Sequence, residues 1–249
     1  MKEEYNLYDN QEFFDGYKKL RSNKMSANNV EEKPALFAKM PSLLGKSILD
    51  LGCGYGENCK TFAQMGADYV LGIDISEKML SVAKEQNLLS NVEFRKMNMN
   101  NLADVDRKFD VVVSSLAFHY IEDFGALICS IKNLMNDGGI LLFTQEHPIA
   151  TAPKSGIKWK TNGDYIEGVL LTDYSEEGVR DVNWIIEHVI KYHRKTSTII
   201  NTIIKQGFVI MEIDEPSVSN EIIQKEHCLS RCLHAPDYLI VKAKLTDIK

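Results

Sequence analysis

The sequence lacks both the long apolar runs and the basic charge that would indicate a membrane or a nucleic acid as partner. No stretch approaches the roughly 20 apolar residues that span a bilayer, and residues 1–5 are polar, without the apolar core of a signal peptide. The 35 acidic residues outnumber the 29 Lys and Arg residues, which gives a formal net charge of −6. Proteins that bind nucleic acids usually present a basic face instead. We therefore expect a cytoplasmic protein, a monomer or homodimer, with neither membrane nor nucleic-acid partners.

Cysteine is also scarce, and its spacing does not indicate a disulfide framework. The five cysteines are Cys53, Cys59, Cys129, Cys228 and Cys232. An odd number at uneven spacings is not typical of paired cysteines, so we expect reduced thiols. His227 and His234 flank the last two cysteines, but ligands this close together match no common structural zinc site. The sequence predicts no metal site.

The most informative stretch is residues 47–57, where an apolar run ending in Asp50 leads into Gly52, Gly54 and Gly56. This pattern predicts a strand, a tight turn and the N-terminus of a helix. Glycine lets the backbone approach a ligand closely, and the free N–H groups of a helix start favour an anionic group. The dinucleotide fingerprint is not met, because its third glycine would come one residue later, where a glutamate stands. No Lys-Ser/Thr pair follows, which excludes a P-loop.

The order Asp-x-Gly-x-Gly-x-Gly resembles motif I of the class I S-adenosylmethionine-dependent methyltransferases, and Asp50, Gly52, Gly54 and Gly56 match it position for position. The resemblance implies that these residues, together with Cys53, hold the amino-acid end of S-adenosylmethionine. It also implies a Rossmann-like α/β fold with a seven-stranded, mostly parallel sheet, an antiparallel last strand and helices on both faces. Further strands are expected at 69–74, 92–96, 109–115, 140–145, 208–216 and 238–245. With 249 residues, 44% of them hydrophobic, the chain can bury the core of one such domain.

A second acidic residue at a strand end fits the same interpretation. The apolar run 69–74 ends in Asp74, 22 positions after Gly52. This is close to the separation of roughly 20 residues at which the second strand of a Rossmann-like fold presents a carboxylate to ribose hydroxyls. Asp74 could instead cap the following helix, but Ser76 is well placed for that role. We therefore favour ribose binding.

The adenine end of the cofactor is predicted less directly. In the methyltransferase pattern, an aspartate after the third strand usually meets the adenine amino group. Asn98 occupies that position here and is followed by Met99. An amide oxygen can also accept a hydrogen bond from an exocyclic amine. Met99 and Ile75 could supply apolar contacts to the base.

Two histidines are candidates for contact with the reacting groups. Residues 109–121 strongly resemble motif IV of small-molecule methyltransferases, and the strand in this segment ends at Ser115, at the sheet edge where ligands bind in open α/β folds. We count Ser115 among the cofactor-binding residues. His119 could act as a base, orient a group or only pack beside the cofactor. Glu146 and His147 follow the fifth strand, pair a carboxylate with an imidazole and are candidates for substrate contact; His119 and His147 are the predicted catalytic residues.

Two segments are expected to cover the site. Residues 1–40 contain an amphipathic helix that either packs on the sheet edge or forms a lid, with Tyr17 or Arg21 reaching the cofactor carboxylate. The methyltransferase domain is assigned to residues 41–249. Within it, residues 150–193 form an insertion rich in aromatic residues that is expected to cap the substrate pocket.

The sequence thus predicts an S-adenosylmethionine-dependent methyltransferase that acts on a small molecule by in-line displacement. Its later motifs resemble a bacterial group of small-molecule methyltransferases. A protein that binds S-adenosylmethionine or S-adenosylhomocysteine without turnover is an alternative, because the motifs concern the cofactor. An NAD-dependent oxidoreductase is a second alternative, disfavoured by the glycine spacing.

Overall fold

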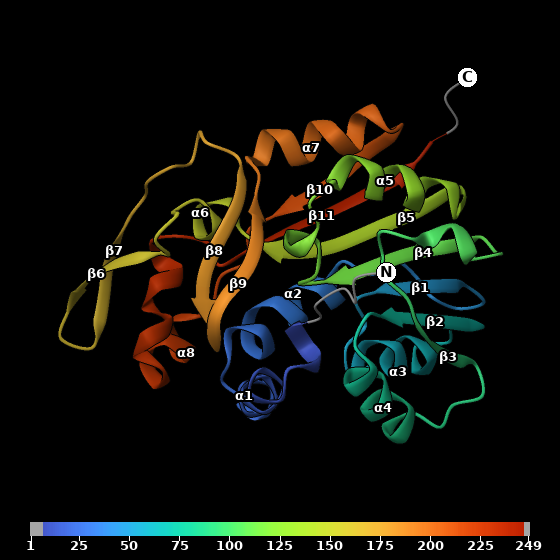
Figure 1. The fold of residues 1–249 in the computed structure, drawn as a ribbon, viewed down its shortest axis with the longest axis horizontal. Coiled ribbons are helices and arrows are strands. Elements are labelled where there is room, and N and C mark those ends of the chain that lie inside the picture. Colours follow the sequence, from blue (N-terminus) through green and yellow to red (C-terminus); the bar gives the residue numbers. More distant parts are fainter. Residues whose placement is uncertain (1–6, 247–249) are drawn as a thin grey trace.

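The computed structural model describes residues 7–246 and is built around one seven-stranded sheet (Figure 1). In sheet order the strands are β10 (Phe208–Asp214), β11 (Tyr238–Leu245), β5 (Met135–Glu146), β4 (Phe109–Ser115), β1 (Ser47–Leu51), β2 (Tyr69–Asp74) and β3 (Val92–Lys96). Strand β11 runs antiparallel to β10 and β5, whereas the pairs from β5 to β3 are parallel. The predicted fold class is confirmed.

Helices cover both faces of this sheet, because successive residues of its central strands point to opposite sides. Ile48 of β1 packs with α3 (Glu57–Gln64) and α4 (Glu77–Gln86), and also with α2 (Lys33–Ala38). Leu49, the next residue, packs on the other face with α5 (Phe124–Asn133) and α7 (Thr196–Lys205). The continuous apolar runs in the sequence correspond to these doubly covered strands.

The other elements lie at the carboxyl edge of the sheet. They are α1 (Gln11–Ser22), the π-helical turn Asn28–Glu32, α6 (Pro148–Thr151), β6 (Lys158–Asn162), β7 (Tyr165–Leu170), β8 (Gly178–Trp184), β9 (Ile186–His193) and α8 (Asn220–Lys225). Short 3₁₀ helices span Leu7–Asp9, Leu102–Asp104, Phe118–Tyr120 and His227–Leu233. No helix in residues 7–246 has both the length and the apolar character that a bilayer crossing needs.

Several element boundaries differ from the sequence prediction. Residues 182–191, for which strand and helix both remained open, lie in the hairpin β8–β9. Strand β5 begins at Met135 instead of residue 140, because the turn around Gly138 (φ 73°) is accommodated as an irregularity in the pairing with β4. Ser76 caps α4 as predicted, since its hydroxyl accepts a hydrogen bond from the Met79 N–H group.

Helix α1 and the hairpin β8–β9 are in direct contact (Figure 1). A Cβ atom on Gly16 would lie 2.4 Å from Cγ2 of Ile185 at the hairpin tip, so α1 and the tip approach as closely as a glycine allows. The Phe13 and Trp184 rings meet edge to face with centroids 5.5 Å apart. The two segments, far apart in sequence, therefore form one continuous cover.

The packing of α3 against the sheet gives a prediction for stability. Phe62 is fully buried, with its ring centroid 5.8 Å from that of Phe37. Phe62→Ala should lower the free energy of unfolding by about 3–5 kcal/mol, because the loss of the ring leaves a cavity. Urea denaturation measures this loss. Leu88→Ala, at a side chain that is 89% exposed, is the control and should change stability by less than about 0.5 kcal/mol.

Candidate cofactor and substrate site

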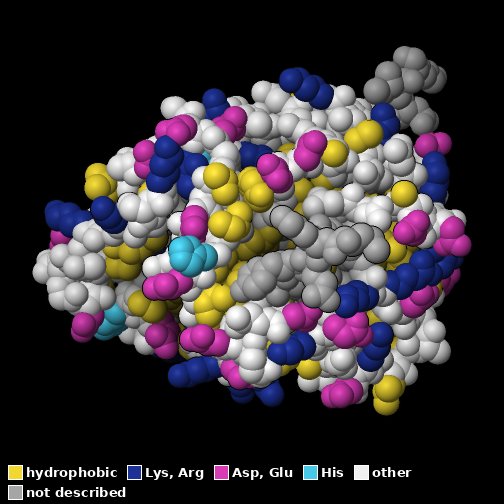
Figure 2. Space-filling model, in the orientation of Figure 1, with side chains coloured by type: hydrophobic (Ala, Val, Ile, Leu, Met, Phe, Trp, Pro, Cys, Tyr) yellow, Lys and Arg dark blue, Asp and Glu magenta, His cyan; other side chains and the backbone are white. Residues whose placement is uncertain are grey.

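A cavity of about 800 Å³ lies between the carboxyl edge of the sheet and the cover formed by α1 and β8–β9. Figure 2 shows hydrophobic side chains gathered around a hollow in this part of the surface. Ten of the residues predicted to form the site line the cavity: Tyr17, Arg21, Gly52, Gly54, Asp74, Ile75, Asn98, Met99, Ser115 and His119. Four others do not contribute to its lining: Asp50, Cys53, Gly56 and His147.

The glycine turn connects β1 to α3 and has two different requirements for glycine. Gly54 (φ 54°) lines the cavity, and a Cβ atom there would have no neighbour within 4 Å, so its backbone is open to a ligand. Gly56 (φ 71°) precedes α3 and packs under the ring of Phe94, which a Cβ atom would approach to 2.5 Å. Gly54 therefore keeps the turn accessible, whereas Gly56 allows it to pack on the sheet.

Asp74, at the end of β2, is held by the same turn. Its Oδ2 accepts a hydrogen bond from the Gly54 N–H group at 2.9 Å, and its Oδ1 accepts one from the Ser76 N–H group at 2.9 Å. Burial raises the pKa of Asp74, while these two donors favour the ionised form. Each carboxylate oxygen has a further lone pair for a donor in the cavity.

Asp50 and Cys53 lie beneath the turn. The Asp50 carboxylate is buried and accepts a hydrogen bond from the Cys59 thiol at 3.2 Å. Burial raises the pKa of Asp50 to about 7 and that of Cys53 to about 11. The Cys53 N–H group donates to the Ile73 carbonyl at 2.9 Å. Both residues thus support the turn, and a contact of either with the cofactor stays a prediction.

The three residues expected near adenine are Asn98, Met99 and Ile75. Asn98 lines the cavity, and its Oδ1 accepts a hydrogen bond from the Asn100 N–H group at 2.9 Å. The methyl group of Met99 lies 3.3 Å from where a Cβ atom of Gly52 would be. Ile75 lines the cavity as well. All three residues line the cavity, and their contact with adenine stays a prediction.

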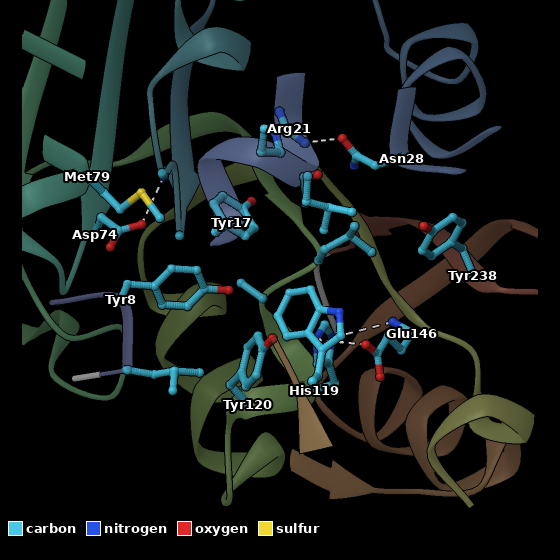
Figure 3. Close-up of a pocket in the computed structure, with 18 of the residues that line it drawn as sticks. Tyr8, Tyr17, Arg21, Asn28, Asp74, Met79, His119, Tyr120, Glu146 and Tyr238 are labelled. Carbon is cyan, nitrogen blue, oxygen red and sulfur yellow. Dashed lines mark hydrogen bonds and ion pairs between the residues drawn. The ribbon is translucent and has the colours of Figure 1, made fainter. Parts of the chain in front are cut away.

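Tyr17 and Arg21 project from α1 toward the cavity (Figure 3). Arg21 donates to Glu57 at 2.7 Å and to Asn28, and Lys33 also contacts Glu57. Glu57, the glutamate at the position where the dinucleotide fingerprint requires glycine, thus holds two cations from the N-terminal segment at the start of α3. A contact between Arg21 and a cofactor carboxylate stays a prediction.

Glu32 is a buried residue that the sequence does not mark as functional. Its carboxylate accepts hydrogen bonds from Ser115 at 2.8 Å, from Asn28 at 2.7 Å and from Thr144. Ser115 and Thr144 stand at the ends of β4 and β5, so Glu32 joins the N-terminal segment to the two strands. A pair of glutamates in a polar stretch gives no signal of burial, because only the tertiary contacts create it.

His119 lines the cavity from the 3₁₀ helix after β4, and its Nδ1 accepts a hydrogen bond from the Glu146 N–H group at 3.4 Å. The other ring nitrogen, Nε2, therefore carries the hydrogen and lies 3.9 Å from Oε1 of Glu146. Burial lowers the pKa of His119 to about 4, so the ring is neutral near pH 7. Lys191 donates to the same Glu146 oxygen at 2.5 Å.

His147 has a different environment from that of His119. Its Nδ1 accepts a hydrogen bond from the Ile149 N–H group at the start of α6, and its Nε2 lies 2.9 Å from Oε1 of Glu215. Both ring nitrogens are engaged by the protein, and the side chain is not part of the cavity lining. This geometry does not favour the predicted catalytic role.

Cys232, considered above for zinc, lies in another group of side chains. Its thiol is 3.4 Å from Oε2 of Glu31 and 3.7 Å from Oδ2 of Asp237. Arg231 binds both carboxylate oxygens of Asp237. Burial raises the pKa of Cys232 well above its usual value, so its thiol is protonated near pH 7. The guanidinium and the protonated thiol make this group a poor cation site.

Comparisons with known proteins identify the family. The strand order and glycine turn define a Rossmann-like fold of the methyltransferase type, and residues 44–205 match a family model described as a methyltransferase domain. The crystal structure of an S-adenosylmethionine-dependent methyltransferase from Mesorhizobium loti is similar, with a TM-score of 0.79 and 33% identity over 90% of this chain and 99% of that one. The chain belongs to the S-adenosylmethionine-dependent methyltransferase family.

Two further relatives do not identify the acceptor. An uncharacterised protein of Haemophilus influenzae is 38% identical over 99% of this chain and 100% of its own length. A ubiquinone biosynthesis O-methyltransferase of Acinetobacter baylyi is 33% identical over 128 residues, which are 50% of this chain and 52% of that enzyme. The methyl acceptor must therefore be inferred from the site itself.

The raised pKa of Asp50 predicts how stability depends on pH. An unfolded aspartate titrates near pH 3.9, so between about pH 4 and pH 7 the folded chain binds more protons than the unfolded chain. The contribution of Asp50 to the free energy of unfolding should therefore fall as the pH rises through this range. Between pH 5 and pH 8 the free energy of unfolding of the wild type should change more toward destabilisation than that of Asp50→Asn, by on the order of 3 kcal/mol. Urea denaturation at the two pH values measures this difference, and equal changes in both proteins would contradict the account.

Proposed function

We propose that the protein transfers a methyl group from S-adenosylmethionine to a small-molecule acceptor bound in the same cavity. The main support is Asp74, a carboxylate held in place by two backbone N–H groups at the cavity wall. When bound, S-adenosylmethionine supplies an electrophilic methyl group, which an acceptor atom attacks in line while the electron pair of the broken C–S bond stays on sulfur.

The residues at one end of the cavity fit this cofactor. Asp74 can accept hydrogen bonds from both hydroxyls of a ribose through its remaining lone pairs. The open backbone at Gly54 suits the amino-acid end of the molecule. Ile75, Asn98 and Met99 line the adjacent wall, where a base would contact apolar and amide groups.

The cover over the cavity would exclude water from the reacting groups. We propose that the N-terminal segment, residues 1–40, acts as a lid and that the segment 150–193 acts as a cap. From the lid, Tyr8 and Tyr17 line the cavity, and from the hairpin β8–β9 of the cap, Trp184 and Tyr192 do so. The cover would orient the acceptor against the cofactor, and such alignment can contribute up to roughly 7–11 kcal/mol to catalysis.

The assignment of the cofactor end gives a direct test by calorimetry with S-adenosylmethionine. Asp74→Ala should weaken binding at least about tenfold, because it removes hydrogen bonds to a charged group. His147→Ala is the matched control, since this side chain does not line the cavity, and it should bind S-adenosylmethionine like the wild type. Equal losses in the two variants would contradict the proposed roles.

Turnover separates the proposed enzyme from its alternatives. Incubation with S-adenosylmethionine and a pool of small metabolites should release S-adenosylhomocysteine, detected by mass spectrometry. Cofactor binding without release would favour a binding protein. Binding of NAD in place of S-adenosylmethionine would favour an oxidoreductase.

A further inference from the structure

We propose that Glu146 binds the methyl acceptor, and that the acceptor is a planar aromatic compound whose reacting atom carries a hydrogen, as in a phenol or an aromatic amine. This inference rests on the proposed methyltransferase function and assigns the other end of the same cavity. Glu146 ends β5 and lies across the cavity from Asp74 (Figure 3).

The two carboxylate oxygens of Glu146 have different surroundings. Lys191 donates to Oε1 at 2.5 Å, and His119 Nε2 lies 3.9 Å from the same oxygen. Within residues 7–246, no protein donor reaches Oε2, although the side chain lines the cavity. The Glu146 side chain is 24% exposed and Oε2 is not a buried atom, so this oxygen is open to the cavity and can accept a hydrogen bond. An N–H or O–H group of a bound acceptor would donate it.

His119 is a positioning residue for this carboxylate. Its Nδ1 is occupied by the Glu146 N–H group and its Nε2 already carries a hydrogen, so the neutral ring has no free lone pair with which to take a proton. Lys191 holds the carboxylate from the other side, and its ammonium group lies 4.9 Å from the centroid of the Trp184 ring. His119, Glu146 and Lys191 thus form one connected group at the end of the cavity opposite Asp74.

The walls between Asp74 and Glu146 are aromatic, which favours a planar acceptor. Tyr8, Tyr17 and Tyr120 lie between the two carboxylates (Figure 3). Aromatic rings bind other rings in stacked or edge-to-face arrangements, which add to the burial of apolar area. A planar acceptor could therefore contact these rings while its polar hydrogen reaches Glu146.

The proposed contact also accounts for the proton that must leave the acceptor. When the acceptor atom forms its bond to the methyl carbon it becomes positively charged, and its hydrogen becomes strongly acidic. Burial would raise the pKa of Glu146, but the charge of the Lys191 ammonium group and its hydrogen bond hold this pKa below its usual value. Such a weakly basic carboxylate suffices for a proton that has become acidic, which then passes from Oε2 to water.

Binding of matched probes tests the proposal. Phenol, aniline and anisole have the same ring, but anisole has no hydrogen to donate. In the complex with S-adenosylhomocysteine, the wild type should bind phenol and aniline at least about tenfold more tightly than anisole, because a hydrogen bond to a charged group is lost with anisole. Ligand-observed NMR titrations give the dissociation constants, and the comparison of phenol with aniline separates the two acceptor types.

Variants then assign the preference to Glu146. Glu146→Gln should reduce it severalfold, and so should Glu146→Gln combined with Lys191→Met, which avoids leaving a buried unpaired ammonium. Glu215→Gln is the control, since Glu215 pairs with His147 beside Glu146 but does not line the cavity, and it should keep the full preference. Weaker S-adenosylhomocysteine binding in the wild type than in typical methyltransferases would count against the proposed function instead.

The pH dependence gives an independent readout. In Lys191→Met the effect of burial on Glu146 is opposed less strongly, so its pKa should rise. Lowering the pH protonates Glu146 and removes the preference for phenol over anisole. In Lys191→Met this loss should occur at a higher pH than in the wild type. Equal binding of phenol and anisole by the wild type, no binding of any probe, or an unchanged preference in Glu146→Gln would overturn the proposal.

Discussion

Buried and half-buried carboxylates at the carboxyl edge of the sheet are the constraint on which the rest of the structure depends. A buried charge is costly unless hydrogen-bond donors surround it. Asp74 accepts hydrogen bonds from backbone N–H groups, and Oε1 of Glu146 accepts one from the Lys191 ammonium group. Glu32 is satisfied by the hydroxyls of Ser115 and Thr144. Each acid therefore fixes the local structure that supplies its donors, and together they place the cavity walls.

This constraint explains why the N-terminal segment is part of the site. Glu32 has its donors on β4 and β5, so the chain before α2 must pass across the strand ends. Arg21 and Glu57 then tie α1 to the start of α3. With α1 in this position, its aromatic side chains contact Trp184 of the cap. The cover is thus a consequence of where buried charges find partners.

The sequence predicted the sheet and most of the residues that line the cavity at the glycine turn, because their signals are local. The strands at 69–74, 92–96, 109–115 and 238–245 have the predicted bounds, since each shows a local pattern of apolar residues, continuous at 69–74 and alternating at 92–96. Asp74 and Gly54 were identified because strand ends and glycine spacing are read from neighbouring residues. The burial of Glu32 and the hairpin between residues 178 and 193 were not predicted, because both depend on contacts between distant segments. For the same reason, sequence could not separate the environments of His119 and His147.

The two ends of the cavity are built by different means, and this bears on how specificity could vary. The proposed cofactor end depends on backbone N–H groups of Gly54 and Ser76, which are fixed by the register of β1 and β2. The proposed acceptor end depends on side chains, among them Tyr8 and Tyr17, which precede the region matched by the family model at residues 44–205. Side chains outside the shared domain can change without altering the sheet. Changes in the proposed lid can therefore alter the proposed acceptor end while the backbone geometry around Asp74 stays the same.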